Sequence, residues 1–101
     1  MIKKYFNKNF NLINFKKFKD KRGYFYESYK KNYYNNLGIK DNFIQDNQSF
    51  SSSKYTVRGL HFQKKPFAQS KLITVLKGSI YDVVIDLRKK SPTYGNFKSF
   101  E

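Results

Sequence analysis

The chain contains one histidine, and the residues around it have types and spacing that suit acid–base chemistry. His61 follows Arg58 by three positions within Tyr55–Gln63, and Gly59 lies between them. A neutral imidazole accepts a proton near pH 7, and a guanidinium binds phosphate oxygens with paired donors. On a regular strand, residues three apart point to opposite faces. Convergence of Arg58 and His61 therefore requires a bulge or twist, which Gly59 permits.

Each candidate residue also has an ordinary structural interpretation, which the sequence leaves open. A lone histidine on a strand is more often packed or exposed than catalytic, and Arg58 beside a glycine suits a surface charge. Lys71 is one of 18 lysines. Asp82 suits a sheet edge, where a charge opposes aggregation. The case for a site therefore depends on whether the fold brings these residues together.

The clearest strand signal is a pair of apolar segments, Leu72–Leu76 and Ile80–Leu87, separated by Lys77-Gly78. Apolar, β-branched runs around a turn glycine predict a β-hairpin. A turn centred between Lys77 and Gly78 pairs Ile73 with Asp82.

Two more polar features interrupt apolar sequence. Lys71 comes just before the predicted hairpin, where it shares a face with Asp82 and lies diagonally across the ladder from it, within reach of a long side chain. The polar run Gln45-Asp46-Asn47 follows Phe43-Ile44 in a segment expected to be extended.

The N-terminal part predicts short strands and one helix. Lys21-Arg22-Gly23 predicts a turn into a strand over Tyr24–Glu27. Ser28 is expected to cap a helix that runs to about Leu37 and is closed by Gly38. Apolar residues before the turn are enough for one or two short strands: Leu12, Ile13, Phe15 and Phe18.

Further along the chain, Tyr55–Gln63 and Phe97–Glu101 are strand candidates, and Ser51–Ser53 belongs to a polar loop. Many short strands with a single helix predict an all-β sandwich or barrel. No repeat or linker divides the sequence.

Composition limits the classes of protein to consider. A length of 101 residues allows one small domain, and 20% aromatic residues exclude a disordered polycation despite a net charge of +14. The absence of cysteine excludes disulfides, thiolate catalysis and Cys-ligated metals, and a single histidine leaves little for a metal site. The sequence contains no apolar run of about 18 residues, so no membrane span is predicted. Without the apolar middle of a secretory signal, the expected location is the cytoplasm.

Six segments, in this order, resemble the dTDP-4-dehydrorhamnose 3,5-epimerase family, from about Lys21 to Glu101. RGLHFQ followed by SPTYG is the most specific combination. The matching segments are KRGYFYESY (21–29), FIQDNQSFSS (43–52), VRGLHFQ (57–63), AQSKL (68–72), GSIYDVVIDLR (78–88) and SPTYG (91–95).

This resemblance implies a cupin-type jelly roll, usually a homodimer, that acts on a dTDP-linked 4-keto-6-deoxy sugar on the way to dTDP-L-rhamnose and surface polysaccharide. The family acts without a metal or an organic cofactor. We expect no association with a membrane and no specific nucleic-acid partner. Residues 1–101 would then be a single partial domain, the N-terminal part of an incomplete jelly roll.

The resemblance also assigns roles to residues. His61 is expected to be the general base that removes protons beside the 4-keto group. The chemistry also needs a positive group at the ketone oxygen, and Lys71, held by Asp82, is our candidate for it. Arg22 and Glu27 lie in a part of the family that tends to serve the neighbouring subunit's site. The expected nucleotide-sugar contacts are Arg22, Glu27, Gln45, Asp46, Asn47, Arg58 and Lys71.

Two parts of the family's machinery are missing from this sequence. The general acid, a tyrosine, and the carboxylate that orients the histidine lie in the second half of the family's domain, so we expect the chain alone to be inactive. Related dTDP-sugar 3-epimerases, 5-epimerases and 3,4-ketoisomerases remain alternatives. Others are an inactive partner that assembles with a full-length homologue, and a basic, aromatic-rich module that binds nucleic acid.

Overall fold

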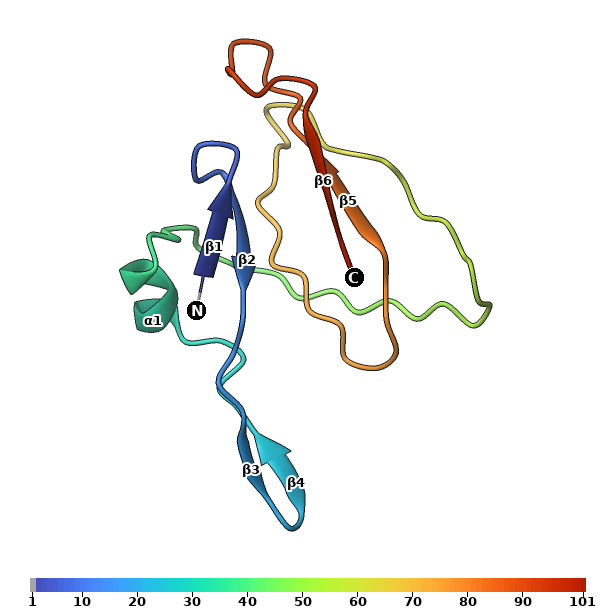
Figure 1. Ribbon diagram of the computed structural model, residues 1–101. Coiled ribbons are helices and arrows are strands. Elements are labelled where there is room, and N and C mark those ends of the chain that lie inside the picture. The colour runs from blue at the N-terminus through green and yellow to red at the C-terminus, as the bar shows by residue number, and fades with distance from the viewer. Residues whose placement is uncertain (1) are drawn as a thin grey trace. The chain divides into compact units, whose positions relative to one another are not determined.

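The computed structural model describes residues 2–101, which form two compact units, residues 2–40 and residues 41–101 (Figure 1). The described residues contain six strands of three or four residues each and one helix. The strands pair as three separate antiparallel ribbons. The predicted all-β class with one short helix is confirmed.

The first ribbon joins β1 (Ile2–Tyr5) to β2 (Phe10–Ile13). The connection carries three successive residues with positive φ, Phe6 to Lys8 at 49°, 53° and 68°. The Asn9 side chain stabilises it by donating to the carbonyls of Phe6 and Asn7, both at 3.1 Å. The expected strand at Leu12 and Ile13 is therefore confirmed, and its partner is the lysine-interrupted segment β1.

The second ribbon joins β3 (Phe18–Asp20) to β4 (Gly23–Phe25) through the predicted turn at Lys21-Arg22. The Asp20 carboxylate accepts from the Arg22 backbone N–H at 2.8 Å, which fixes the turn. The second strand ends at Phe25, which pairs with Phe18, the first residue of β3. The prediction that it reaches Glu27 was wrong, because the ladder ends at the Phe18–Phe25 pair and residues 14–17 form no strand.

The helix α1 (Lys31–Asn36) begins later than predicted. Its N-cap is Lys30, without a side-chain hydrogen bond, and the Ser28 carbonyl instead accepts from the Tyr34 hydroxyl at 2.8 Å. The end is as predicted: Gly38, at φ +89°, donates to the Asn35 carbonyl and Ile39 donates to the Tyr34 carbonyl. These two bonds make a Schellman motif, for which glycine is favoured.

Tyr34 is the centre of this unit. Its side chain is 2% exposed and its ring lies 5.1 Å from that of Tyr29 and 6.0 Å, edge-on, from that of Tyr33. Burial raises the pKa of Tyr34, and the neighbouring tyrosines add to the effect.

The helix α1 has six residues, which is too short to cross a membrane, and the described residues contain no longer helix.

The second unit contains one ribbon, β5 (Asp82–Ile85) paired with β6 (Phe97–Phe100). The predicted final strand is therefore confirmed. The predicted hairpin around Lys77-Gly78 was wrong in its pairing: the chain bends there (Figure 1), but Asp82 lies opposite Phe100 instead of Ile73. The prediction of a strand over Tyr55–Gln63 was wrong: Tyr55 lies in a turn, and residues 56–63 form no regular element.

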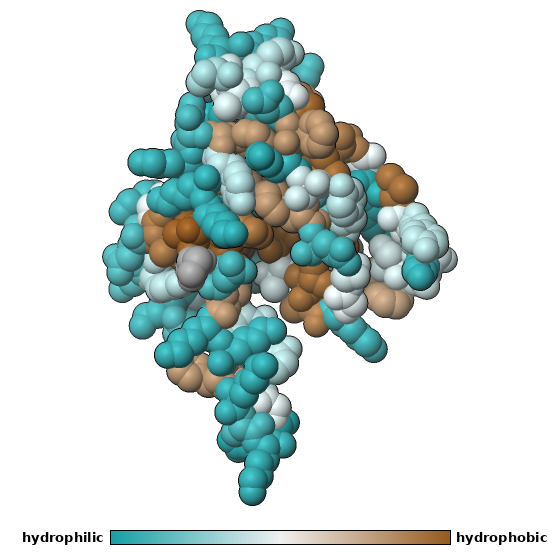
Figure 2. Space-filling view, viewed as in Figure 1, coloured by the Kyte–Doolittle hydropathy of each residue, from teal (hydrophilic) through white to brown (hydrophobic). Residues whose placement is uncertain are grey.

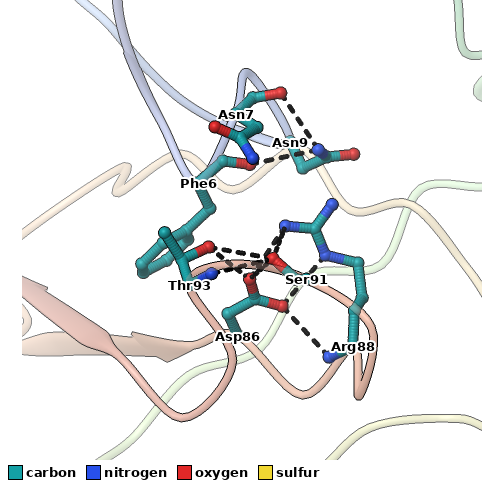
Figure 3. A network of polar contacts seen from close by, with 7 residues as sticks. All are labelled: Phe6, Asn7, Asn9, Asp86, Arg88, Ser91 and Thr93. Atoms are coloured by element: carbon teal, nitrogen blue, oxygen red, sulfur yellow. Dashed lines mark hydrogen bonds and ion pairs between the residues drawn. The ribbon is translucent and has the colours of Figure 1, made fainter.

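The physical reason for the β5–β6 pairing is the buried carboxylate of Asp86, 4% exposed, at the end of β5 (Figure 3). It accepts from Thr93 Oγ1 at 2.6 Å, Ser91 Oγ at 2.7 Å and Arg88 Nη2 at 2.8 Å. Gly95 donates to the Asp86 carbonyl at 2.8 Å. The turn at Lys77-Gly78 has no such network, so β5 pairs with the segment that Asp86 brings beside it.

Replacing Asp86 is expected to loosen the β5–β6 ribbon. The Asp86→Asn variant loses the charge that strengthens three side-chain hydrogen bonds, so the Gly95 amide should exchange with solvent about tenfold faster or more. Asp20→Asn is the matched control, because Asp20 pairs with Arg22 in the same Asp-x-Arg spacing but its side chain is 52% exposed. Native-state hydrogen exchange of both variants measures the difference, and equal effects would contradict it.

The same carboxylate gives a pH dependence. Hydrogen bonds from Arg88 and Thr93 hold the pKa of Asp86 well below its usual range. A lowered pKa means that the stabilisation is complete above the unfolded value of about 3.9 and is lost as pH falls through the folded value. Thermal unfolding should therefore show a loss of stability below about pH 4 that is weaker in Asp86→Asn.

Candidate functional site

The contact that defines the candidate site is between Gly59 and His61. A Cβ atom at position 59 would lie 2.7 Å from the His61 Nδ1 and 3.0 Å from the His61 backbone nitrogen. Gly59 also has a φ of +87°, a backbone angle that residues with a side chain rarely adopt. The backbone change expected at Gly59 is thus present, and the missing side chain leaves room for the imidazole.

Arg58, the neighbour of this contact, is tied to the preceding loop. Its Nε donates to Ser51 Oγ at 3.2 Å and its Nη2 to the Phe50 carbonyl at 3.4 Å. Within the loop, Thr56 Oγ1 donates to the Ser53 carbonyl at 2.7 Å. The two Arg58 bonds leave the N–H groups of Nη1 available to a ligand.

The polar run that follows Ile44 is also partly ordered by its own side chains. Gln45 Nε2 donates to Asn47 Oδ1 at 3.2 Å, so these two amides are brought together. Asp46 between them is exposed. The run therefore presents amide and carboxylate groups to solvent, where they can bind a polar ligand.

Lys71 and Asp82 are not joined by an ion pair in the described residues. Their predicted relation depended on a hairpin ladder that does not form, so no cross-strand register aligns them. Asp82 is half-buried in β5, while Lys71 is exposed on an extended segment. That segment is held at the residue before Lys71, where Ser70 Oγ donates to Asp41 Oδ1 at 2.6 Å.

Arg22 and Glu27 belong to the first unit. Arg22 Nη2 lies 2.6 Å from Asp20 Oδ2, and its side chain is 91% exposed. The same hydrogen bond lowers the pKa of Asp20. Glu27 is exposed just after β4. Because Arg22 already has a carboxylate partner, an incoming anion would have to compete with Asp20.

Sequence reasoning assigned no role to the Asp86 network. Its signal was nevertheless present in two quoted motifs, DLR and SPTYG, which place an acid, a guanidinium and two hydroxyls within eight residues. A buried carboxylate with several donors in short range is typical of a fixed loop. Among residues 2–101, no three side chains of the metal-binding kinds gather into a site.

Comparison with known proteins shows the family. The sequence model of the family described as dTDP-4-dehydrorhamnose 3,5-epimerase matches residues 8–101. The chain belongs to the dTDP-4-dehydrorhamnose 3,5-epimerase family. The expected resemblance is therefore confirmed, and the curated members of this family are named as epimerases, which are isomerases.

Among the relatives, the dTDP-4-dehydrorhamnose 3,5-epimerase of Sinorhizobium fredii is 46% identical over 90 residues, which are 89% of this chain and 46% of that protein. The epimerase of Methanothermobacter thermautotrophicus is 47% identical over 79 residues, 77% of this chain and 41% of the relative. The chain thus spans about half the length of the curated relatives it matches.

A solved structure shows the same fold. The crystal structure of the dTDP-4-dehydrorhamnose 3,5-epimerase from Bacillus anthracis, with TDP and PPi bound, matches with a TM-score of 0.93 and 47% identity. The match covers 97% of this chain and 55% of that chain. The predicted cupin-type fold is confirmed by this likeness.

Substitution at Gly59 tests the contact with His61. Gly59→Ala should displace the imidazole, because its new methyl would sit within 2.7 Å of Nδ1. Since the chain has one histidine, its ring signals in ¹H–¹⁵N NMR are unambiguous. We expect those signals to shift in Gly59→Ala.

Gly78→Ala is the matched control for this experiment. Gly78 has a similar φ of +82° but nothing within 4 Å of the added Cβ. It therefore carries the same backbone strain, of order 1–3 kcal/mol, without touching the imidazole. Unchanged His61 signals in Gly59→Ala, or equal shifts in both variants, would show that Gly59 does not place the ring.

Proposed function

We propose that this chain supplies the proton-abstracting and nucleotide-binding half of a dTDP-4-dehydrorhamnose 3,5-epimerase site. The observation that carries the proposal is the likeness of 97% of the chain to an epimerase solved with TDP and PPi bound. The RGLHFQ segment, with His61 fitted against Gly59, lies within the matched family region.

In this proposal His61 is the general base. Protons on the two carbons beside a ketone are acidic because their removal gives an enolate, and a neutral imidazole is a suitable acceptor near pH 7. The C–H electrons form a double bond to the carbonyl carbon, the C=O π electrons move onto the oxygen to give the enolate, and the proton passes to the His61 nitrogen. Reprotonation from the opposite face inverts the carbon.

The enolate oxygen needs a positive group, and Lys71 is the proposed one. Fixed charge directed at a developing oxyanion is often the largest catalytic contribution. The Ser70–Asp41 hydrogen bond of 2.6 Å supports this role, because it anchors the backbone next to Lys71. Asp82 is given no part in this proposal, because it pairs with Phe100 and no ladder aligns it with Lys71.

The nucleotide contacts are proposed on charge and geometry. Arg58 has its guanidinium anchored through Nε and Nη2, so Nη1 can donate to diphosphate oxygens without losing those bonds. Gln45, Asp46 and Asn47 offer amide and carboxylate groups for the nucleoside or sugar. Arg22 and Glu27 are proposed to serve the neighbouring subunit of a homodimer, as the family resemblance implies.

Complete epimerisation is proposed to need groups outside these 101 residues. By resemblance, the general acid tyrosine and the carboxylate that orients the histidine lie in the half of the domain that the match does not include. The exposure of His61, Arg58 and Lys71 supports this proposal, because an acid–base site works best when water is excluded.

Titration with dTDP tests the proposal. We expect weak binding at physiological salt that exceeds binding to a random single-stranded DNA of equal charge. Arg58→Gln should weaken it about tenfold, since a charge-assisted phosphate contact is lost. Lys64→Gln removes the same charge nearby from an exposed position and should have little effect.

The opposite outcome favours a nucleic-acid function. Tighter binding of the oligonucleotide, with a steep decrease as salt rises, is the behaviour of a basic surface that contacts many phosphates. Equal losses in Arg58→Gln and Lys64→Gln would likewise indicate a diffuse effect of the +14 charge and contradict a dTDP site.

A further inference from the structure

One side-chain hydrogen bond joins two distant parts of the second unit. Ser70 Oγ donates to Asp41 Oδ1 at 2.6 Å, across 29 positions of sequence. The other hydrogen bonds described for residues 44–81 span eight positions or fewer. The Asp41–Ser70 bond is therefore the long-range restraint on this segment, and it acts on the residue immediately before Lys71.

This bond closes a loop of chain that carries most of the proposed site. At 2.6 Å its length is typical of a charge-assisted O–H···O⁻ bond, which is about twice as strong as a neutral one. Joining the two ends of a long segment costs conformational entropy, so a strong bond is needed to hold them together. The proposed site residues inside the loop are Gln45, Asp46, Asn47, Arg58 and His61.

The restraint at Ser70 distinguishes Lys71 from the other lysines. Charge alone does not, because the chain has 18 lysines and Figure 2 shows polar and charged residues, in teal, over much of the visible surface. Within residues 2–101, neither Asp41 nor Lys71 forms an ion pair. The Asp41 carboxylate thus holds the backbone beside Lys71 without occupying its ammonium, which stays free to meet an anionic oxygen.

We infer that Asp41 is a positioning residue for the Lys71 ammonium and acts through Ser70. The inference rests on the proposed function, in which Lys71 stabilises the enolate oxygen. A charge stabilises a developing oxyanion best when its position is set before the reaction, because no reorganisation is then needed. By holding Ser70, Asp41 limits the positions that the Lys71 side chain can occupy. Asp41 should therefore affect proton removal more than binding of the nucleotide.

Charge disfavours a direct role of Asp41 in binding the nucleotide. A carboxylate repels a diphosphate, and Oδ1 of this one already accepts from Ser70. A role through Ser70 requires only an acceptor at position 41. An amide in place of the carboxylate should therefore keep the function, and a methyl group should not.

Deuterium incorporation beside the ketone tests the inference, with the 101-residue chain in D₂O and a saturating dTDP-linked 4-keto-6-deoxy sugar. Asp41→Ala should slow incorporation about fivefold, as for one lost hydrogen bond, and leave the dissociation constant of dTDP within about twofold. Asp41→Asn keeps the acceptor and should retain most of the rate. The control is Ser79→Ala, which removes an exposed hydroxyl of the same unit that has no hydrogen bond in the described residues.

A double variant shows whether Asp41 acts through Lys71. In a Lys71→Gln background, Asp41→Ala should cause no further loss of rate, because the group that it positions is already gone. A further fivefold loss in that background would overturn the inference. So would a loss of dTDP binding as large as the loss of rate, or an Asp41→Asn variant as slow as Asp41→Ala.

Backbone ¹⁵N relaxation of residues 70–72 tests the restraint without the reaction. Asp41→Ala should lower the order parameters there, whereas Asp41→Asn and Ser79→Ala should leave them unchanged. Unchanged order in Asp41→Ala would overturn the inference. The proposed function fails instead if the wild-type chain incorporates no deuterium or if His61→Ala changes nothing, and the relaxation data then still decide whether Asp41 restrains the Lys71 segment.

Discussion

The one strand pair of the second unit, β5 with β6, depends on one buried carboxylate. Asp86 accepts hydrogen bonds from the side chains of Arg88, Ser91 and Thr93, and its own backbone bonds to Asn96 and Gly95 (Figure 3). These bonds close the loop between β5 and β6 and so fix which residues pair across the ribbon. A buried charge is stable only when it is fully partnered, and each donor here comes from within ten residues.

The proposed catalytic residues have no comparable support. The His61 ring occupies space that a Cβ at Gly59 would fill. Arg58 is held by two hydrogen bonds to the loop that precedes it. These local contacts orient side chains but do not exclude water, and the segment that carries them is exposed throughout.

Local features could be predicted from the sequence, and long-range pairing could not. The turn at Arg22 and the helix end at Gly38 depend on neighbouring residues, and both were predicted correctly. The hairpin at Lys77-Gly78 failed because apolar runs around a glycine specify strand tendency without specifying a partner. The predicted start of α1 was wrong: the N-cap is Lys30, and the Ser28 carbonyl accepts from the Tyr34 hydroxyl.

The candidate site was predicted in the same uneven way. A backbone change was expected at Gly59, and Gly59 has a φ of +87°, which glycine adopts readily. The link between Lys71 and Asp82 required a cross-strand register and is absent from the described structure. The Asp86 network was overlooked because its donors are ordinary loop residues until the fold buries them.

Deuterium incorporation into the dTDP-linked 4-keto-6-deoxy sugar tests the central proposal, that His61 is the base that removes the proton beside the ketone. The chain alone is incubated with the sugar nucleotide in D₂O, and the two carbons beside the ketone are followed by NMR. The account predicts slow incorporation at one carbon, no inversion at both, and loss of incorporation in His61→Ala. Turnover to the L-configured product by this chain alone, or unchanged incorporation in His61→Ala, would contradict it.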